Sequence, residues 1–400
     1  MSDTIRLYYL EPGLTEAEAT LVEVIQSRPH PLLVLDRSLF YPEGGGQPSD
    51  LGTIAGVPLS EVTEEGGRIL HRMGGDFEGR PGQRLRLVLD ADRRRDHREQ
   101  HSAQHLLSAL LLRLYEAPTL SFHLGAEHST IDIDLPSLGA EDVAEVERRI
   151  DEAIEGDYPV TTHLCPPEDV ASFPLRKRPP EDESELRIVE IDGIDFSPCC
   201  GTHVGSTGEL RAIKIVGVER YKGMTRLSFV AGRRAVRDYA LVSRIAQAGA
   251  GAFGCALDEL PEKARRSVER LKKLESSAGA LIRERAALEA RLAAAGEGGL
   301  SALTVLRFVD RDAQASQESA RAFAARGSLT IAISLPELTV SVAGPEYQSS
   351  VELGRVLKPL AEAQGGRGGG GRNSFRASFP GVEALDAFVE AARAELGRSP

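Results

Sequence analysis

The chain has 400 residues, a formal net charge of −12, 41% hydrophobic residues and 27% charged residues. This length exceeds one ordinary core, so we expect two or three domains of globular composition. No apolar run is long enough for a membrane span, no signal peptide is visible, and four cysteines are too few for a disulfide scaffold. These features predict a cytoplasmic protein with no membrane partner, and the negative charge argues against indiscriminate nucleic-acid binding.

Residues 1–90 carry the pattern of a small β-barrel. Strand-like segments at residues 5–10, 32–35 and 84–89 are separated by glycine and proline turns. One turn differs from the others, since Gly44, Gly45 and Gly46 follow one another and Gln47 comes next. Three glycines allow a backbone to approach a ligand closely, or they form a flexible loop, and the sequence leaves both open.

Residues 92–116 are predicted to form a helix with Asp92 as its cap and a leucine stripe on one face. His101 and His105 are four residues apart, so both imidazoles lie on one side of this helix. Such a pair serves either as two metal ligands or as ordinary packed or surface histidines.

An α+β domain is predicted for residues 91–250, with strands at 120–124, 129–135, 158–164, 186–191, 210–218 and 225–231 and helices at 141–156 and 233–247. The charged, proline-containing segment 176–183 is expected to be a solvated loop rather than an RNA contact. Cys199 and His203 lie in a tight turn after a strand. Together with His101 and His105 they offer three nitrogens and one sulfur, a set that suits a tetrahedral zinc ion.

Residues 251–298 are rich in Leu, Glu, Arg, Lys and Ala and are predicted to be a helical linker or a coiled coil through which two chains associate. Residues 299–400 alternate strands and helices, including a helix at 348–364, and are predicted to be an α/β domain. Its loop at residues 365–372, which contains Arg367 and Arg372, is either a phosphate cradle or a mobile linker.

These motifs together resemble a known family. The segments His101-Ser-Ala-Gln-His105 and Cys199-Cys-Gly-Thr-His203 are similar to the editing domain of alanyl-tRNA synthetases and of the free-standing AlaX-type deacylases. The segment from Ser38 to Asp50 resembles the glycine motif of the family's N-terminal barrel, and the C-terminal Gly/Arg loop resembles that of the DHH-associated domain. The resemblance covers nearly the whole chain and is to the long free-standing form.

The resemblance implies zinc-dependent hydrolysis of tRNA(Ala) mischarged with serine or glycine. It implies His101, His105, Cys199 and His203 as Zn²⁺ ligands, Ser38 and Gln47 as catalytic residues and Gly44, Gly45 and Gly46 as substrate-binding residues. Arg367 and Arg372 are the expected tRNA contacts. A pocket sized for alanine rejects glycine and serine poorly, so a second hydrolytic site is physically reasonable. Four protein ligands are typical of a structural zinc site, and a catalytic zinc would need one of them to be loosely bound, so the sequence leaves both roles of the metal open.

This chain departs from the family's pattern at two positions: Cys200 stands where the family has Gly, and Ser38 where it has Thr. Two alternative functions compete with the hydrolase. One is a tRNA- or partner-binding protein with a structural zinc site. The other is a phosphodiesterase, which is disfavoured because Asp96-His97 is followed by Arg98 and the Asp-His-His core is absent.

Overall fold

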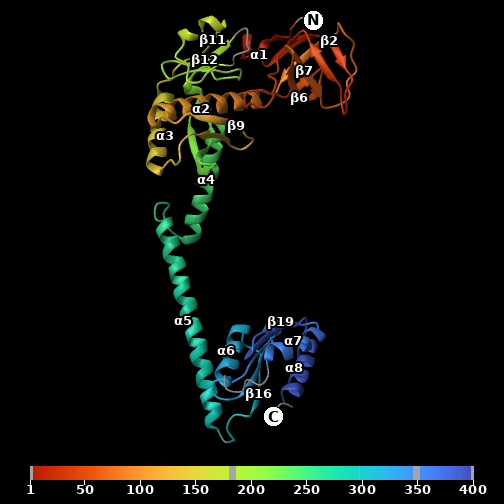
Figure 1. Cartoon of the computed structure of the whole chain (residues 1–400), viewed down its shortest axis with the longest axis vertical. Helices are drawn as coiled ribbons and strands as arrows, with labels where there is room; N and C mark the ends of the chain where they lie inside the picture. The colour runs from red at the N-terminus through yellow and green to blue at the C-terminus, as the bar shows by residue number, and fades with distance from the viewer. Residues whose placement is uncertain (1–2, 180–185, 297, 346–351, 398–400) are drawn as a thin grey trace. The chain divides into compact units, whose positions relative to one another are not determined.

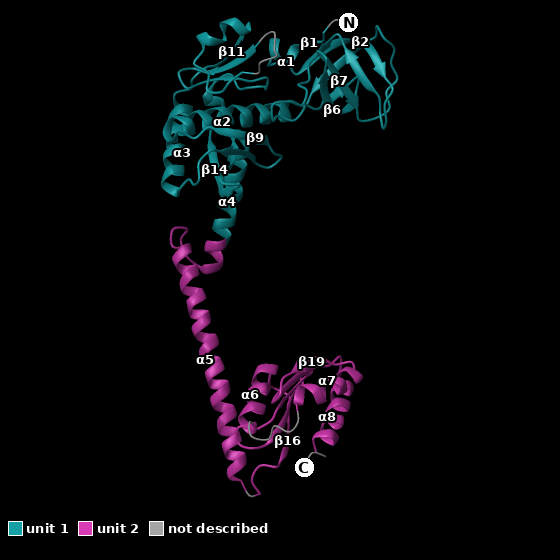
Figure 2. Cartoon of the chain, viewed as in Figure 1, with its two compact units in different colours: residues 1–248 teal, residues 249–400 magenta. Residues whose placement is uncertain are grey.

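The computed structural model of the protein describes residues 3–179, 186–296, 298–345 and 352–397 (Figure 1). The chain divides into two compact units, residues 1–248 and 249–400 (Figure 2). Helices and mainly antiparallel sheets occur in both units, so the predicted mixed α+β class is confirmed. The finer division into four domains, at residues 90, 250 and 298, stays a prediction.

Unit 1 begins with a closed barrel of six strands in the order β2-β3-β7-β6-β5-β8. The strands are β2 (Glu16–Ile25), β3 (Leu32–Leu35), β5 (Gly52–Ile54), β6 (Val57–Glu65), β7 (Arg68–Met73) and β8 (Arg84–Leu89). Alternate side chains point inward, and Leu33, Ile54, Val62 and Ile69 are fully buried in this core. Two short strands, β1 (Ile5–Arg6) and β4 (Arg37–Ser38), form a separate parallel pair.

The prediction of a strand at residues 5–10 is correct for Ile5 and Arg6 and wrong for residues 7–10. Residues 7–10 form a single helical turn, α1 (Leu7–Leu10), with the Glu11 N–H bonded to the Leu7 carbonyl. Two consecutive side chains, Leu7 and Tyr8, are buried here. The Tyr8 ring packs edge-on against Tyr41.

The second part of unit 1 is built around the helix α2 (Ala91–Tyr115). A four-stranded sheet has the order β14-β15-β10-β9, and a three-stranded sheet has the order β11-β12-β13. Their bounds are β9 (Thr119–Leu124), β10 (Ser129–Ile133), β11 (Val160–Cys165), β12 (Leu186–Ile191), β13 (Asp195–Pro198), β14 (Ile213–Tyr221) and β15 (Met224–Ala231), with α3 (Ala140–Glu155) and the short 3₁₀ helices η1 (Pro167–Ser172) and η2 (Thr207–Leu210).

The core of this part lies between α2, α3 and the four-stranded sheet. The predicted leucine stripe of α2 is buried there with Ile131, Leu227 and Phe229. The cap of α2 was predicted two residues late, because Asp90 and not Asp92 accepts the Arg93 N–H, at 3.0 Å. The rigid packing of α2 fixes the positions of the side chains on its opposite face.

The helix α4 (Gly232–Phe253) contains the boundary between the units, and α5 (Leu260–Ala295) follows it. Unit 2 has a five-stranded sheet in the order β16-β17-β18-β20-β19. Its other elements are β16 (Leu303–Phe308), α6 (Ala313–Ala324), β17 (Leu329–Ser334), β18 (Thr339–Ala343), α7 (Leu353–Ala363), β19 (Arg367–Gly370), β20 (Ser374–Ser378) and α8 (Val382–Leu396). Residues 348–351 of the predicted helix 348–364 lie outside the described residues.

The Gly/Arg segment is not a loop over its whole length, which corrects the prediction of a phosphate cradle or mobile linker. Residues Arg367–Gly370 form the edge strand β19, paired antiparallel with β20. Its glycines allow close approach, since a Cβ on Gly368 would lie 2.1 Å from the Arg376 carbonyl oxygen. Among the described residues, none of the helices is long and apolar enough to cross a membrane.

Candidate metal centre and active site

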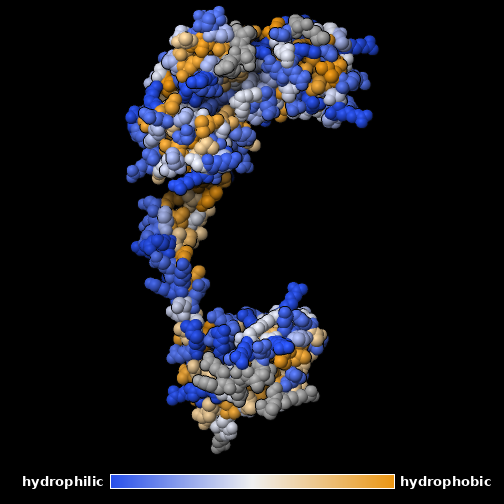
Figure 3. Space-filling view, in the orientation of Figure 1, coloured by the Kyte–Doolittle hydropathy of each residue, from blue (hydrophilic) through white to orange (hydrophobic). Residues whose placement is uncertain are grey.

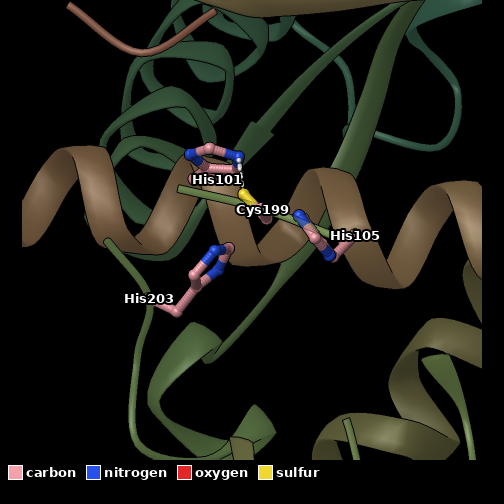
Figure 4. Close-up of side chains that lie close together, drawn as sticks. All are labelled: His101, His105, Cys199 and His203. Carbon is pink, nitrogen blue, oxygen red and sulfur yellow. Dashed lines mark hydrogen bonds between the residues drawn. The ribbon is translucent and has the colours of Figure 1, made fainter. Parts of the chain in front are cut away.

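Four side chains from two distant segments meet in unit 1 (Figure 4). His101 and His105 project from one face of α2, and Cys199 and His203 come from the turn that follows β13. One potential ligand atom from each residue lies within 4.8 Å of the others. The three histidines are buried and Cys199 is half-buried. The four residues expected as ligands are therefore brought together, while the binding of a metal by them stays a prediction.

Each histidine of the cluster is held through its Nδ1 atom by a neighbour outside the cluster. Gln47 Oε1 lies 2.9 Å from His101 Nδ1, Asp195 Oδ2 lies 3.0 Å from His105 Nδ1, and Ser102 Oγ lies 3.1 Å from His203 Nδ1. With Nδ1 as the donor, the Nε2 lone pair of each ring is left for the centre of the cluster. Such outer hydrogen bonds fix the tautomer and orientation of metal-binding histidines.

The centre of the cluster has the chemistry of a zinc site. His203 Nε2 is buried and has no hydrogen-bond partner among the described residues. Cys199 Sγ lies 3.3 Å from His101 Nε2, a separation of neighbouring ligands that a tetrahedral ion accommodates. Three imidazole nitrogens and one sulfur fit zinc better than they fit magnesium or calcium, which prefer oxygen ligands.

The surroundings lower the pKa values of two of the four candidate ligands, His101 and Cys199. Burial lowers the pKa of His101 to about 3, with smaller contributions from Lys177 and Arg187, so this imidazole is neutral. Burial raises the pKa of the Cys199 thiol, but His105, the Gly201 N–H and Arg187 outweigh it, and the net pKa is lowered. A neutral imidazole and a thiolate are the species that coordinate zinc.

The turn carrying Cys199 is clamped by Arg187 on β12. One guanidinium nitrogen of Arg187 donates to the Cys199 carbonyl at 2.7 Å and to the Gly201 carbonyl at 2.8 Å. Gly201 packs directly against the cluster, because a Cβ there would lie 2.2 Å from His101 Cε1. Cys200 is exposed. The departure from the family's Gly-Gly pattern therefore falls on the position that has room for a side chain.

The glycine motif reaches the cluster through Gln47. Gly44 and Gln47 exchange backbone hydrogen bonds of 3.1 and 2.9 Å, and the residues between them, Gly45 and Gly46, have φ angles of +57° and +80°. Gln47 Oε1 accepts the His101 Nδ1–H and the Thr202 N–H, the latter at 3.1 Å, while its Nε2 donates to Thr202 Oγ1 at 3.0 Å. Gln47 thus connects the barrel to both halves of the cluster.

A pocket of about 520 Å³ opens beside the cluster. Its lining includes three of the four cluster residues, one residue of the glycine motif, part of β9 and four cationic side chains: His101, His105, Cys199, Gly45, Thr119, Leu120, Ser121, Phe122, Arg176, Lys177, Arg178 and Arg187, with Gln104, Pro179, Leu186, Pro198 and Cys200. A concave site with a metal-binding cluster on one side and cations on another suits an anionic substrate with a hydrolysable bond.

Ser38 lies away from this pocket. It is fully buried on β4, and its Oγ accepts the Phe40 N–H at 3.1 Å and lies 2.8 Å from His71 Nε2. His71 Nδ1 in turn lies 3.1 Å from the Leu33 carbonyl oxygen, so Nε2 accepts the Ser38 hydroxyl proton. Ser38 is absent from the pocket lining given above, and its predicted contact with substrate stays a prediction.

Asp195 and Arg176 were not identified as site residues from the sequence. Arg176 Nε donates to Asp195 Oδ1 at 2.7 Å, while Asp195 Oδ2 holds His105. The expectation of a solvated loop at residues 176–183 was therefore wrong for Arg176, and Pro180–Glu183 lie outside the described residues. A carboxylate just before a Cys-x-x-x-His turn was the available signal, but such residues are common on strand ends.

Comparisons with known proteins agree with the geometry. Residues 186–228, which include Cys199 and His203, match the family described as "Threonyl and Alanyl tRNA synthetase second additional domain". The chain is 30% identical to the alanyl-tRNA editing protein AlaX-L of Pyrococcus horikoshii over 98% of this chain and 99% of that protein. It is 34% identical to the alanyl-tRNA editing protein Aarsd1 of Danio rerio over 64% of this chain and 63% of that protein.

A third relative is the alanine–tRNA ligase of Methanoregula boonei, 28% identical over 98% of this chain and 43% of the ligase. Residues 186–228 are therefore similar to an additional domain of threonyl- and alanyl-tRNA synthetases, and this segment supplies two of the four cluster residues. Because the AlaX-L protein of Pyrococcus horikoshii matches along nearly its whole length at 30% identity, the chain belongs to the family of alanyl-tRNA editing proteins of the AlaX-L type. The resemblance drawn from the motifs is confirmed.

Proposed function

We propose that this protein hydrolyses the ester bond of mischarged tRNA(Ala) in trans, with serine as the expected amino acid and glycine as a further candidate. The observation that carries the proposal is the pocket beside His101, His105 and Cys199, which has a cationic rim. Its relatives are alanyl-tRNA editing proteins and an alanine–tRNA ligase. Water adds to the ester carbonyl, the bond to the ribose oxygen breaks, and the free amino acid and the intact tRNA are released.

Zinc is the proposed cofactor, held by His101, His105, Cys199 and His203. A bound zinc ion polarises a carbonyl or lowers the pKa of water, or it shapes the pocket without taking part in the chemistry. The protein's own contribution is orientation. Gln47, Asp195 and Ser102 hold the three Nδ1 atoms, and Arg187 holds the turn of Cys199.

The substrate is proposed to enter along the glycine motif. Gly44, Gly45 and Gly46 leave the backbone open to an aminoacyl group, and Gly45 lines the pocket. Lys177 and Arg178 line the pocket, and we propose, in place of the expected solvated loop, that they contact the phosphates at the 3′ end of a tRNA. Ser38 is proposed to influence catalysis, from within the barrel, through the segment that leads to the glycine motif.

Unit 2 is proposed to add tRNA affinity and to form a homodimer. Arg367 and Arg372 are exposed on and beside β19, where they can contact phosphates. One face of α5 packs within unit 2, against α6, and its residues Gly279, Ala286 and Ala290 are buried. Apolar side chains lie exposed along the rest of this helix (Figure 3), namely Leu271, Leu274, Leu281, Leu288 and Leu292. Their recurring spacing of three, four or seven residues is that of a coiled-coil seam.

The test of the function is hydrolysis of tRNA(Ala) charged with serine, glycine or alanine by the purified protein. The wild type should release serine faster than alanine. A Cys199→Ala, His203→Ala variant should lose bound zinc by elemental analysis and lose hydrolysis. A matched control, Cys255→Ala with His163→Ala, also removes one cysteine and one histidine but lies outside the cluster, and it should keep both properties.

Two results would contradict the proposal. Full zinc retention by the Cys199→Ala, His203→Ala variant would remove the metal assignment. A folded wild type that binds tRNA(Ala) but releases no amino acid would favour the alternative, a tRNA-binding protein with a structural zinc site.

A further inference from the structure

Gln104 lies on α2 immediately before His105 and lines the pocket. The residue is buried, at 6% exposure, so its side chain forms part of the pocket wall and does not extend into solvent. Neither the metal cluster nor its outer hydrogen bonds use this residue. A polar side chain next to the reacting centre without a role in holding it is a candidate for substrate recognition.

The amide of Gln104 is anchored at one end. Gln104 Nε2 lies 2.8 Å from Ser108 Oγ, one turn along α2. Ser108 Oγ also accepts a hydrogen bond of 2.6 Å from Thr119 Oγ1, at the start of β9. Two elements therefore position the amide. The bond seen for this amide among the described residues is the one made by Nε2, and its oxygen, Oε1, is not one of the fully enclosed polar atoms without a partner, as His97 Nδ1 and His203 Nε2 are.

Among the other polar groups of the pocket, two hydroxyls already donate their protons to neighbours, and the cations have the wrong charge for an amino acid. Thr119 donates to Ser108 as above, and Ser121 Oγ donates to Asp132. The cationic side chains that line the pocket, Arg176, Lys177, Arg178 and Arg187, repel the ammonium group of an aminoacyl ester. They therefore suit the phosphates of the tRNA and not the amino acid. A neutral amide both accepts and donates hydrogen bonds, which matches a hydroxyl group.

We infer that Gln104 is a specificity-determining residue, which hydrogen-bonds the side-chain hydroxyl of a seryl ester and thereby distinguishes it from an alanyl ester. This inference rests on the proposed function. Serine and alanine differ by that hydroxyl alone, and a buried polar group left unpaired by alanine disfavours it. Ser108 and Thr119 act as positioning residues that keep the amide aimed at the hydroxyl.

The experiment compares Gln104→Met with the wild type on seryl- and alanyl-tRNA(Ala) at equal zinc content. Methionine keeps the length and volume of glutamine but cannot hydrogen-bond well. We expect kcat/KM for the seryl substrate to fall by about tenfold or more, the value for the alanyl substrate to stay within about twofold, and bound zinc to be unchanged. Ser108→Ala, which frees the amide, should change the seryl-to-alanyl ratio in the same direction by a smaller factor.

Equal losses on both substrates in Gln104→Met, or no loss on either, would overturn the inference and leave the hydrolase intact. If Gln104→Met does not fold, an unchanged seryl-to-alanyl ratio in Ser108→Ala overturns it. A wild type that hydrolyses neither substrate overturns the proposed function and the inference together.

Discussion

Replacing Asp195 with Asn tests how the protein orients its metal-binding histidines. The carboxylate is buried, with 1% of the side chain exposed, and accepts hydrogen bonds from His105 Nδ1 at 3.0 Å and from Arg176 Nε at 2.7 Å. Asparagine has the same shape but no charge and only one acceptor oxygen. That oxygen cannot serve both donors as the two carboxylate oxygens do, and the NH₂ group facing the other donor is repulsive.

The expected result is a fall in zinc affinity. Loss of an outer partner of a metal-bound histidine typically costs tenfold to a hundredfold in affinity, or about 1.4–2.7 kcal/mol. The measurement is a competition titration against a chromophoric zinc chelator at about neutral pH, at which Asp195 is ionised because its two partners lower its pKa in spite of burial.

The matched control is Asp132→Asn. Asp132 forms the same forked pair, with Arg226 Nε at 2.7 Å and Nη2 at 2.9 Å, but it does not contact a histidine of the cluster. Both variants should lose some stability toward unfolding, whereas only Asp195→Asn should bind zinc more weakly. Unchanged zinc affinity in Asp195→Asn, or an equal loss in the two variants, would refute the reasoning that this carboxylate orients the ligand.

Three further predictions concern other parts of unit 1. Gly201→Ala should weaken zinc binding, because the added Cβ would lie 2.2 Å from His101 Cε1. The control Cys200→Ala changes an exposed side chain and should bind zinc like the wild type. Equal zinc affinities of the two variants would be inconsistent with this packing. Burial lowers the pKa of His71 from 6.5 to about 4, because the folded protein disfavours the protonated ring. The neutral ring therefore contributes roughly 3 kcal/mol to the free energy of unfolding above pH 6.5, and this contribution is lost as the pH falls toward 4. Urea midpoints of His71→Gln should therefore decline less over this range than those of the wild type, and parallel curves would argue against it. Ser38→Ala, assayed on seryl- and alanyl-tRNA(Ala), should lower the hydrolysis of both substrates alike, because Ser38 is fully buried and bonded to His71. A loss of about ten- to thirtyfold for serine alone, the size expected for one lost hydrogen bond to the substrate hydroxyl, would argue against this reasoning.

The sequence by itself determined the elements with strong local patterns. The helix at residues 92–116 was predicted within one residue at each end, because a stripe of leucines at helical spacing is typical of an amphipathic helix. The strands at residues 32–35, 84–89 and 186–191 also match β3, β8 and β12, since short apolar runs between turn residues have one common interpretation. The family followed from two spaced motifs whose combination is rare.

Other elements depended on contacts that no local pattern encodes. Residues 7–10 form a helical turn in which Tyr8 packs on Tyr41, far along the chain. The glycines at residues 368–370 looked like a loop, yet their small size lets them form an edge strand against β20. Local propensity is a weak guide where tertiary packing decides the conformation.

For the candidate site, the sequence named the four cluster residues because a pair of histidines at i,i+4 and a Cys-x-x-x-His turn restrict geometry locally. It could not say that Ser38 faces His71 inside the barrel, while Gln47, nine residues later, reaches the cluster. It also gave no sign that Asp195 and Ser102 would hold the imidazoles, or that Gln104 would face the pocket. These roles depend on which side chains from separate elements come within hydrogen-bonding distance, and only the packing of α2 against the barrel and the two sheets decides that.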